Sequence, residues 1–115
     1  MCVQSCTKPI SYLIALTEHG EEKVHNFVGK EASGRNFNEL CLNPDNLPHN
    51  PLINSGAIMT ASLISPENNL AERFDIITNY WQKLAGNGYI DFDNSTYQSE
   101  RNTADRNRCL AYMMQ

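Results

Sequence analysis

The sequence has few of the features that mark several large classes of protein. Its apolar runs are far shorter than the roughly 18 residues that a membrane-spanning helix requires, so we expect no membrane association. Basic residues are in the minority, with 9 Lys and Arg against 13 Asp and Glu and a formal net charge of −4. Because the basic residues also form no patch, we expect no nucleic-acid partner. The N-terminus shows no recognisable signal or transit segment.

Cysteine and histidine are too sparse to suggest a metal site. The chain has 4 Cys and 3 His, with no Cys-x-x-Cys pair and no ligand spacing between the two residue types. We therefore expect no bound metal and no other cofactor. Four Cys could close two disulfides, but in a chain with so little cysteine we favour reduced thiols. These residues are Cys2, Cys6, Cys41 and Cys109.

What the chain does contain is enough apolar side chain for one small globular domain, 41% of 115 residues. Helical spacing dominates the pattern, so we expect a mainly α fold. A brief alternation predicts a short extended piece at residues 89–92. Helices are expected over residues 6–19, 21–28 and 53–64, from Pro66 to Gly86-Asn87-Gly88, and from a cap at 93–95 to the end of the chain.

Capping residues and apolar spacing refine these expectations. Gly20 is expected to stop the first helix, and Ser65 to cap a helix that has Pro66 at its first position. That helix carries the clearest apolar stripe, formed by Leu70, Phe74, Ile77, Trp81 and Leu84. Residues 29–51 form a long loop rich in turn residues. Such loops are often functional, and a surface loop without a role is equally open.

One short motif suggests nucleophilic catalysis. Residues 5–8 read Ser-Cys-Thr-Lys, and residues three apart share a helix face, so the Lys8 amine can reach the Ser5 hydroxyl. A helix N-terminus favours the serine alkoxide and disfavours the lysine ammonium, as a Ser–Lys acyl-transfer pair requires. Alone the motif is weak, because such a chain holds about half a match by chance. The alternative is that Ser5 caps the helix and Lys8 is a solvated charge.

Further segments separate the families that use Ser-x-x-Lys. Penicillin-binding proteins and class A β-lactamases also need Ser-x-Asn and Lys-Thr-Gly, which this chain lacks. The third family is the glutaminases, and here the chain shows a close resemblance. The similar segments are residues 4–9 (Gln-Ser-Cys-Thr-Lys-Pro), 28–34 (Val-Gly-Lys-Glu-Ala-Ser-Gly), 48–58 (Pro-His-Asn-Pro-Leu-Ile-Asn-Ser-Gly-Ala-Ile) and 97–107, with its Ser-Glu and Arg-Asn pairs. His49 and residues 42–45 resemble the animal-type enzymes more than the bacterial ones.

The resemblance implies hydrolysis of L-glutamine to L-glutamate and ammonia. In that role Ser5 attacks the side-chain carboxamide and also contacts the substrate, while Lys8 acts as its base. Asn54, Glu100 and Asn107 match substrate-binding residues of the family. Glu100 suits the α-ammonium group, and on a continuous helix Asn107 would face the same way two turns later. Without the resemblance, Asn54 would be an N-cap, and Glu100 and Asn107 would be a solvated helix face.

The resemblance also implies that residues 1–115 are part of a larger catalytic domain, the helical portion of the β-lactamase/transpeptidase-like fold without its sheet. Half of the oxyanion hole and the family tyrosines would lie elsewhere, so we expect the isolated chain to be inactive. Similarity to the animal-type enzymes implies a mitochondrial homo-oligomer, with a cytoplasmic location as the alternative. Two other functions stay open: a non-catalytic module that associates with full-length glutaminase, and another Ser–Lys amide hydrolase.

Overall fold

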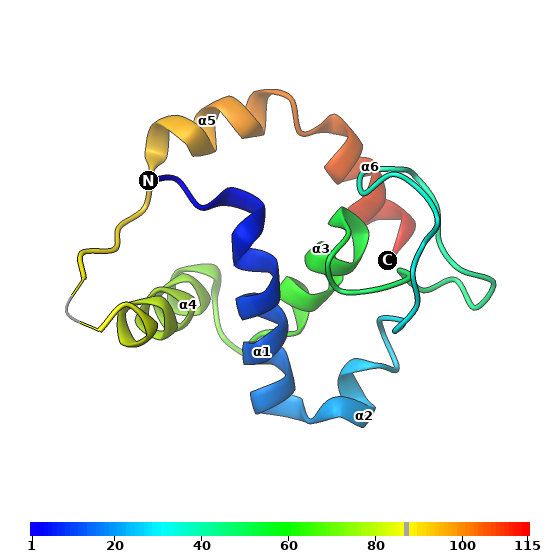
Figure 1. Ribbon diagram of the computed structural model, residues 1–115, viewed down its shortest axis with the longest axis horizontal. Helices are drawn as coiled ribbons and strands as arrows, with labels where there is room; N and C mark the ends of the chain where they lie inside the picture. The colour runs from blue at the N-terminus through cyan, green and yellow to red at the C-terminus, as the bar shows by residue number, and fades with distance from the viewer. Residues whose placement is uncertain (87) are drawn as a thin grey trace.

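The computed structural model describes residues 1–86 and 88–115, and in that part of the chain it is mainly helical with no strand, which confirms the expected fold class (Figure 1). None of the helices in this part is both long and apolar enough to cross a membrane. The elements are a 3-10 helix, η1 (Gln4–Thr7), and the α-helices α1 (Lys8–His19), α2 (Glu21–Val24), α3 (Asn54–Leu63), α4 (Leu70–Leu84), α5 (Asn94–Asn102) and α6 (Asp105–Met113).

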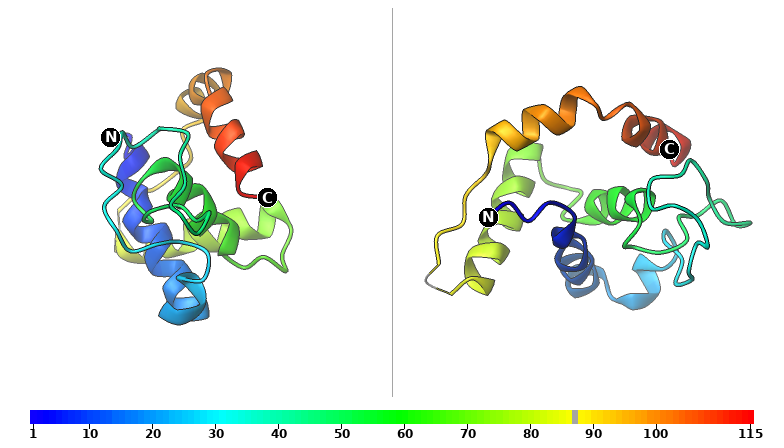
Figure 2. Two further views of the ribbon diagram at one scale, coloured as in Figure 1. Left: turned by 90° about the vertical axis from the view of Figure 1, so that its right-hand side faces the viewer. Right: turned by 45° about the horizontal axis from the view of Figure 1, so that its top comes forward.

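The core lies where α1 meets α2, α3 and α4. The fully buried apolar side chains come from α1, α2 and the residues that follow α2 and α3, while α3 and α4 add partly buried side chains. α1 makes its most extensive contacts with α3. Figure 2 shows α5 lying apart from this core, whereas α6 packs against α3, and Figure 1 shows the N-terminus beside the start of α5. Cys2 Sγ lies 3.7 Å from Thr96 Oγ1 at that point. The fully buried apolar residues of the core cluster are Ile14, Ala15, Val24, Val28 and Ile64.

The first two helices follow the expected pattern in part. The expected helix over residues 6–19 begins as η1 and continues as α1, with Pro9 near its start where a missing N–H is tolerated. It ends at Gly20, whose φ of 79° is a conformation that glycine adopts without strain. The expected second helix is shorter than predicted, because α2 ends at Val24. Beyond it His25 Nδ1 donates to the Val28 carbonyl at 2.8 Å and holds the chain in a turn.

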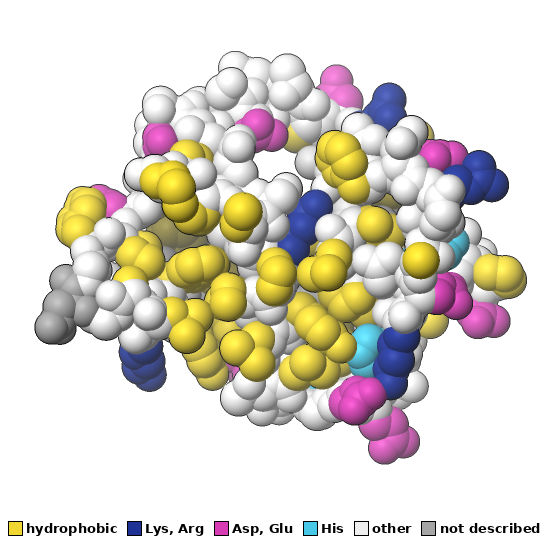
Figure 3. Space-filling model, viewed as in Figure 1, with side chains coloured by type: hydrophobic (Ala, Val, Ile, Leu, Met, Phe, Trp, Pro, Cys, Tyr) yellow, Lys and Arg dark blue, Asp and Glu magenta, His cyan; other side chains and the backbone are white. Residues whose placement is uncertain are grey.

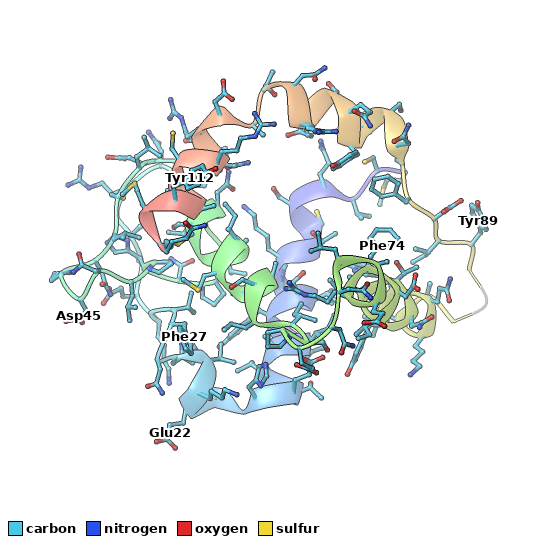
Figure 4. All side chains as sticks on the ribbon, turned by 180° about the vertical axis from the view of Figure 1, so that it is seen from behind. Glu22, Phe27, Asp45, Phe74, Tyr89 and Tyr112 are labelled. Atoms are coloured by element: carbon cyan, nitrogen blue, oxygen red, sulfur yellow. The ribbon has the colours of Figure 1, made fainter. Side chains whose placement is uncertain are left out.

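The long loop over residues 29–51 is held by backbone contacts. Gly29 N–H donates to the Pro48 carbonyl at 2.7 Å, and Glu31 N–H donates to the His49 carbonyl at 3.0 Å. Within the loop the buried Asn43 side chain accepts from the backbone N–H groups of Asp45 and Leu47. The loop is therefore an ordered strap whose two ends lie side by side. Figure 4 shows Asp45 at its outer tip.

The start of α4 is displaced from the position expected at Ser65. The Ser65 N–H and hydroxyl both donate to the Glu18 carboxylate, at 2.7 and 2.8 Å, so this hydroxyl is already engaged. Asn69 is the actual cap: its side chain accepts from the N–H groups of Ala71 and Glu72, while Glu72 accepts from the Asn69 N–H. The prediction that Ser65 caps this helix and that Pro66 begins it is wrong.

The apolar stripe of α4 is only partly covered. Ile77 packs against the core, but Leu70 is 80% exposed and Leu84 55% exposed. Phe74 contacts Phe92 edge to face, with ring centroids 5.5 Å apart. The space-filling view shows apolar side chains gathered over α1 and α4 on this face (Figure 3). The prediction that Gly86-Asn87-Gly88 ends this helix is partly testable: the helix stops at Leu84, and Asn87 lies outside the described residues.

The C-terminal helix is broken in two. Asp93 caps α5 as expected, accepting from the N–H groups of Ser95 and Thr96. The helix does not continue to the end of the chain, because Thr103 leaves helical geometry at φ −115° and its hydroxyl donates to the Glu100 carbonyl. A new helix, α6, begins at Asp105. The prediction of one continuous helix is therefore wrong.

The C-terminus of α3 depends on a side chain from α4. The last carbonyls of a helix have no intrahelical donor, and Arg73 supplies one: its guanidinium donates to the carbonyls of Ala61, Ser62 and Ile64 at 2.7, 3.1 and 2.9 Å. We expect Arg73→Ala to lower the free energy of unfolding by about 1–3 kcal/mol, measured by urea denaturation. Lys83→Ala, an exposed change on the same helix, is the control and should stay within about 0.5 kcal/mol of the unchanged chain.

An equal effect of the two substitutions would show that the guanidinium contacts do not stabilise α3. Arg73→Lys adds a second comparison, because it keeps the positive charge but loses the planar fork. We expect it to recover only part of the lost stability.

Candidate active site

A chain of hydrogen bonds joins three helices that are far apart in the sequence. Lys8 is the first residue of α1, Asn54 the first of α3, and Asn107 lies in the first turn of α6. The Lys8 Nζ donates to Asn54 Oδ1 at 2.7 Å, and Asn54 Nδ2 donates to Asn107 Oδ1 at 3.0 Å. The fold thus brings together three of the five candidate residues from the sequence.

The alternative that Asn54 is an N-cap does not hold. Ile53 occupies the cap position of α3, and the Asn54 side chain is used between the lysine and the second asparagine. The backbone also fixes this residue, because the Asn54 N–H donates to the Phe37 carbonyl at 2.8 Å. The Asn54 amide therefore accepts a hydrogen bond from Lys8 and donates one to Asn107, so these two neighbours determine its orientation.

The environment of Lys8 favours its neutral form. The side chain is half-buried, and burial lowers the pKa of its ammonium group below the ordinary range. The N-terminal end of α1 acts in the same direction, because its partial positive charge repels a cation. The Phe37 ring, with its centroid 5.7 Å from Nζ, opposes this by favouring the charged form. With a lowered pKa, a larger fraction of Lys8 is neutral at a given pH and able to accept a proton.

Ser5 lies in η1, one turn before Lys8. The Lys8 N–H donates to the Ser5 carbonyl, and residues three apart in a 3-10 helix are eclipsed, so both side chains leave the same face. Ser5 is exposed, and within the described residues its hydroxyl makes no hydrogen bond. Val3 and Thr7 occupy the N-cap positions of η1 and α1, so the alternative that Ser5 caps the helix does not hold.

Glu100 reaches the same region from α5. Its Oε1 accepts from Gln4 Nε2 at 3.2 Å, and Gln4 directly precedes Ser5. Glu100, Asn54 and Asn107 also line one cavity of about 320 Å³. The surface is hollowed beneath α5, with a basic side chain at the edge of the hollow (Figure 3). A carboxylate and two amides thus face a space of the size that suits a small polar molecule.

The break at Thr103 changes how Glu100 and Asn107 meet. On one continuous helix they would lie two turns apart on one face, whereas here they belong to two helices joined by a turn. They nonetheless line the same cavity, and Thr103 itself contributes to the wall. Glu100 and Asn107 therefore face the same space as expected, although a turn rather than a continuous helix connects them.

Sequence reasoning missed part of the cavity wall. Phe37 and Asn38 come from the loop, whose irregular backbone has no periodicity from which a direction could be read. Arg106 is adjacent to Asn107 and stood in the quoted motif, but only its neighbour was singled out. The contact of Gln4 with Glu100 links residues 96 positions apart, and no local pattern signals it.

A second, wider hollow of about 600 Å³ lies between α1, α2 and the loop. Its wall includes Tyr12, whose hydroxyl lies 2.6 Å from His25 Nε2. Because His25 Nδ1 donates to a carbonyl, Nε2 of the same tautomer accepts a hydrogen bond from the Tyr12 hydroxyl. In the part of the chain that the structure describes, no group of three or more His, Cys, Asp or Glu residues is placed to hold a metal ion.

Comparison with known proteins places this geometry in a family. A family model described as Glutaminase matches residues 1–115. The chain is 52% identical over 113 residues to "Putative glutaminase 2" of Caenorhabditis elegans and 48% identical to "Glutaminase liver isoform, mitochondrial" of Rattus norvegicus, each match covering 98% of this chain. It is 39% identical to "Glutaminase 2" of Clostridium perfringens, with 97% of this chain covered.

Solved structures agree with the sequence matches. The crystal structure of a probable glutaminase from Bacillus subtilis superposes with a TM-score of 0.89 at 33% identity, covering 99% of this chain and 37% of that one. This chain spans 19% of the two animal relatives and 37% of the clostridial one. The expectation that it is the helical portion of the β-lactamase-like fold is confirmed by these matches. Matched along its whole length by the family model, the chain belongs to the glutaminase family.

Proposed function

We propose that this chain forms the nucleophile-bearing part of a site that hydrolyses L-glutamine to L-glutamate and ammonia. The observation that carries the proposal is the hydrogen-bonded series Lys8–Asn54–Asn107, one turn from an exposed Ser5 hydroxyl. Family membership supports the reaction class. It also supports extending to this chain the activity that the names of its relatives state.

In the proposed mechanism, the neutral Lys8 amine takes the proton of Ser5 as its Oγ attacks the carboxamide carbon. The resulting oxyanion needs hydrogen-bond donors, and the Ser5 N–H can be one of them. In the described part of the chain this N–H has no acceptor, as expected at the start of a helix. Lys8 then returns the proton to the leaving nitrogen, and ammonia departs. Water hydrolyses the acyl-enzyme, again with Lys8 as base.

The residues that line the cavity suit the two ends of glutamine. The Glu100 carboxylate is an acceptor for the α-ammonium group. Asn54 and Asn107 carry both donors and acceptors, which can hold the α-carboxylate or the reacting carboxamide. Since Asn54 also accepts from Lys8, a substrate group bound there is placed beside the proposed base. We propose Ser5 and Lys8 as catalytic residues, and Ser5, Asn54, Glu100 and Asn107 as substrate contacts.

We further propose that residues 1–115 alone hydrolyse glutamine very slowly. Ser5, Gln4 and Glu100 are all exposed, so water reaches both the proposed nucleophile and the carboxylate proposed to bind the α-ammonium group. Electrostatic stabilisation is weak in an open, high-dielectric site. The bacterial relative has well over twice the length of this chain, and we propose that residues beyond the matched region cover the corresponding site.

The test compares residues 1–115 with the protein expressed together with whatever sequence flanks them in its gene. We expect glutamine hydrolysis by the longer form and almost none by residues 1–115. A glutamine analogue with a chloroketone in place of the carboxamide should label the Ser5 peptide of the longer form, as located by mass spectrometry. A labelled β-lactam should not react with that peptide.

Each opposite result has a defined meaning. Labelling of Ser5 by the β-lactam would favour another Ser–Lys amide hydrolase over a glutaminase. Rapid glutamine hydrolysis by residues 1–115, lost in Ser5→Ala, would contradict the proposed inactivity of the isolated chain. Inactivity of both forms, with co-purification of residues 1–115 and a full-length glutaminase, would favour the non-catalytic module.

We also propose that the protein acts in mitochondria as a homo-oligomer. The proposal for the compartment is supported by the word "mitochondrial" in the name of the rat relative. It is tested by the distribution of the native protein between organelle and cytosolic fractions. Light scattering on the longer form tests assembly, and a mass equal to one subunit would contradict it.

A further inference from the structure

We propose that Asn50 is a positioning residue that holds Asn54 opposite Lys8 and thereby sets the reach of the proposed base. The inference rests on the proposed function, because Asn54 and Lys8 belong to the proposed machinery. Asn50 itself lines the wider hollow beside α1 and α2, and it is not among the described residues that line the 320 Å³ cavity. It is half-buried and lies where the long loop leads into α3.

The Asn50 side chain joins the two ends of the long loop to the start of α3. Its Oδ1 accepts from the backbone N–H groups of Leu52 and Ile53, at 3.0 and 3.3 Å. Its Nδ2 donates to the Glu31 carbonyl at 2.9 Å, and the Glu31 N–H donates to the His49 carbonyl at 3.0 Å. A single side chain therefore fixes the direction in which the backbone enters α3.

These contacts satisfy the N–H groups that precede the helical hydrogen bonds of α3. The first N–H groups of a helix have no intrahelical acceptor. Asn50 accepts from Leu52 and Ile53, and the next N–H, that of Asn54, donates to the Phe37 carbonyl at 2.8 Å. Three successive N–H groups are thus held, and the last belongs to the residue that contacts the proposed base. A change of direction in this turn would move the Asn54 side chain directly.

The backbone of Asn50 also lies against α3. An added Cβ at Gly56 would be 1.8 Å from the Asn50 carbonyl oxygen, so the helix approaches this carbonyl very closely. Asn54 lies between the two points of contact, with Ile53 before it and Gly56 after it. Asn50 therefore restrains the backbone of α3 on both sides of Asn54.

An asparagine fits these partners because its amide carries both an acceptor and donors on one short branch. Aspartate keeps the acceptor for the two N–H groups of the turn but cannot donate to the Glu31 carbonyl. Alanine loses all three contacts. The two substitutions therefore separate the contacts that direct Asn54 from the contact that holds the loop.

The test measures glutamine hydrolysis and urea denaturation of the longer form of the protein. We expect Asn50→Ala to lower kcat about tenfold or more, because a small displacement of catalytic groups is costly. Asn50→Asp should retain most of the activity, although both variants lose the Glu31 contact and should have a lower urea midpoint. The control is Asn26→Ala, an exposed asparagine beyond α2, which should leave kcat and the midpoint unchanged.

A double substitution tests whether Asn50 acts through Asn54. In a protein that already carries Asn54→Ala, we expect Asn50→Ala to lower kcat little further. Independent effects would instead multiply the two losses of kcat, and that result would overturn the inference. Equal losses of kcat in Asn50→Ala and Asn50→Asp would also overturn it, because activity would then follow stability alone.

Exchange of backbone amide hydrogens separates this inference from the proposed function. Mass spectrometry of the peptide over residues 52–56 should show faster exchange in Asn50→Ala than in Asn50→Asp. That result, without any glutamine hydrolysis by the unchanged protein, would refute the proposed reaction and retain the positioning role. Hydrolysis that depends on Ser5, with exchange and kcat unchanged in Asn50→Ala, would do the reverse.

Discussion

Replacing Gly56 with alanine should destabilise this protein more than any other single change considered. An added Cβ at Gly56 would lie 1.8 Å from the Asn50 carbonyl oxygen and 2.7 Å from its carbon. Both are backbone atoms, so a side-chain rotation cannot relieve the overlap and α3 must move away from the loop. We expect a loss of about 3 kcal/mol or more in the free energy of unfolding, above the usual range for overpacking. Urea denaturation followed by circular dichroism measures it.

The matched control is Ser62→Ala, an exposed change on the same helix. Alanine favours helix at both positions, so intrinsic propensity predicts a small stabilisation in each case. A large loss of stability in Gly56→Ala together with a small gain in Ser62→Ala would attribute the loss to the close approach at Gly56. Equal, small effects would contradict it, and would show that α3 can shift from Asn50 at little cost.

The Gly56→Ala substitution should also disturb the candidate site, because Gly56 lies close to Asn54 in the sequence. Asn54 lies two residues before Gly56 in α3, so a displacement that relieves the overlap also moves its side chain. Its contacts with Lys8 and Asn107 span 2.7 and 3.0 Å, and a shift of even 1 Å would break both. A folded Gly56→Ala variant should therefore also lose the connection between the proposed base and the proposed substrate contacts.

Local signals in the sequence were sufficient where the competing groups are also local. Gly20 stops α1 and Asp93 caps α5 as expected, because each acts on its own neighbours. Ser65 shows the limit of this reasoning. It has the right chemistry for a cap, but the Glu18 carboxylate, 47 positions earlier, binds both its N–H and its hydroxyl. No pattern around Ser65 contains that information.

The candidate site shows the same difference between what local motifs indicate and what depends on contacts between distant residues. Motifs indicated Lys8, Asn54 and Asn107 individually, whereas their order in one hydrogen-bonded series depends on how three helices pack. The break at Thr103 was missed, because a single threonine in a polar stretch is a weak helix breaker.

Replacing Ser5 with alanine should abolish turnover by the longer form of the protein. The hydroxyl is the proposed nucleophile, and removing such a group from other Ser-dependent hydrolases lowers kcat by about 10⁴-fold or more. Ser5 is exposed and its hydroxyl makes no hydrogen bond within the described residues, so the substitution should leave the free energy of unfolding nearly unchanged. Ser11→Ala in α1 is the control and should retain activity. Retained turnover in Ser5→Ala would refute the nucleophile.

The proposed base Lys8 allows the role of Ser5 to be tested by the pH dependence of kcat/KM. Since Lys8 must be neutral to accept the serine proton, kcat/KM should rise with pH until the pH passes the Lys8 pKa. Burial lowers that pKa, so the rise should be complete at a lower pH than an ordinary lysine would allow. Lys8→Met keeps most of the length of the side chain but removes the base, and we expect it to lower kcat at least about 100-fold and to eliminate the rise. A rise that persists in Lys8→Met would assign the titration to another group. The base would then lie outside the series that connects Lys8 to Asn54.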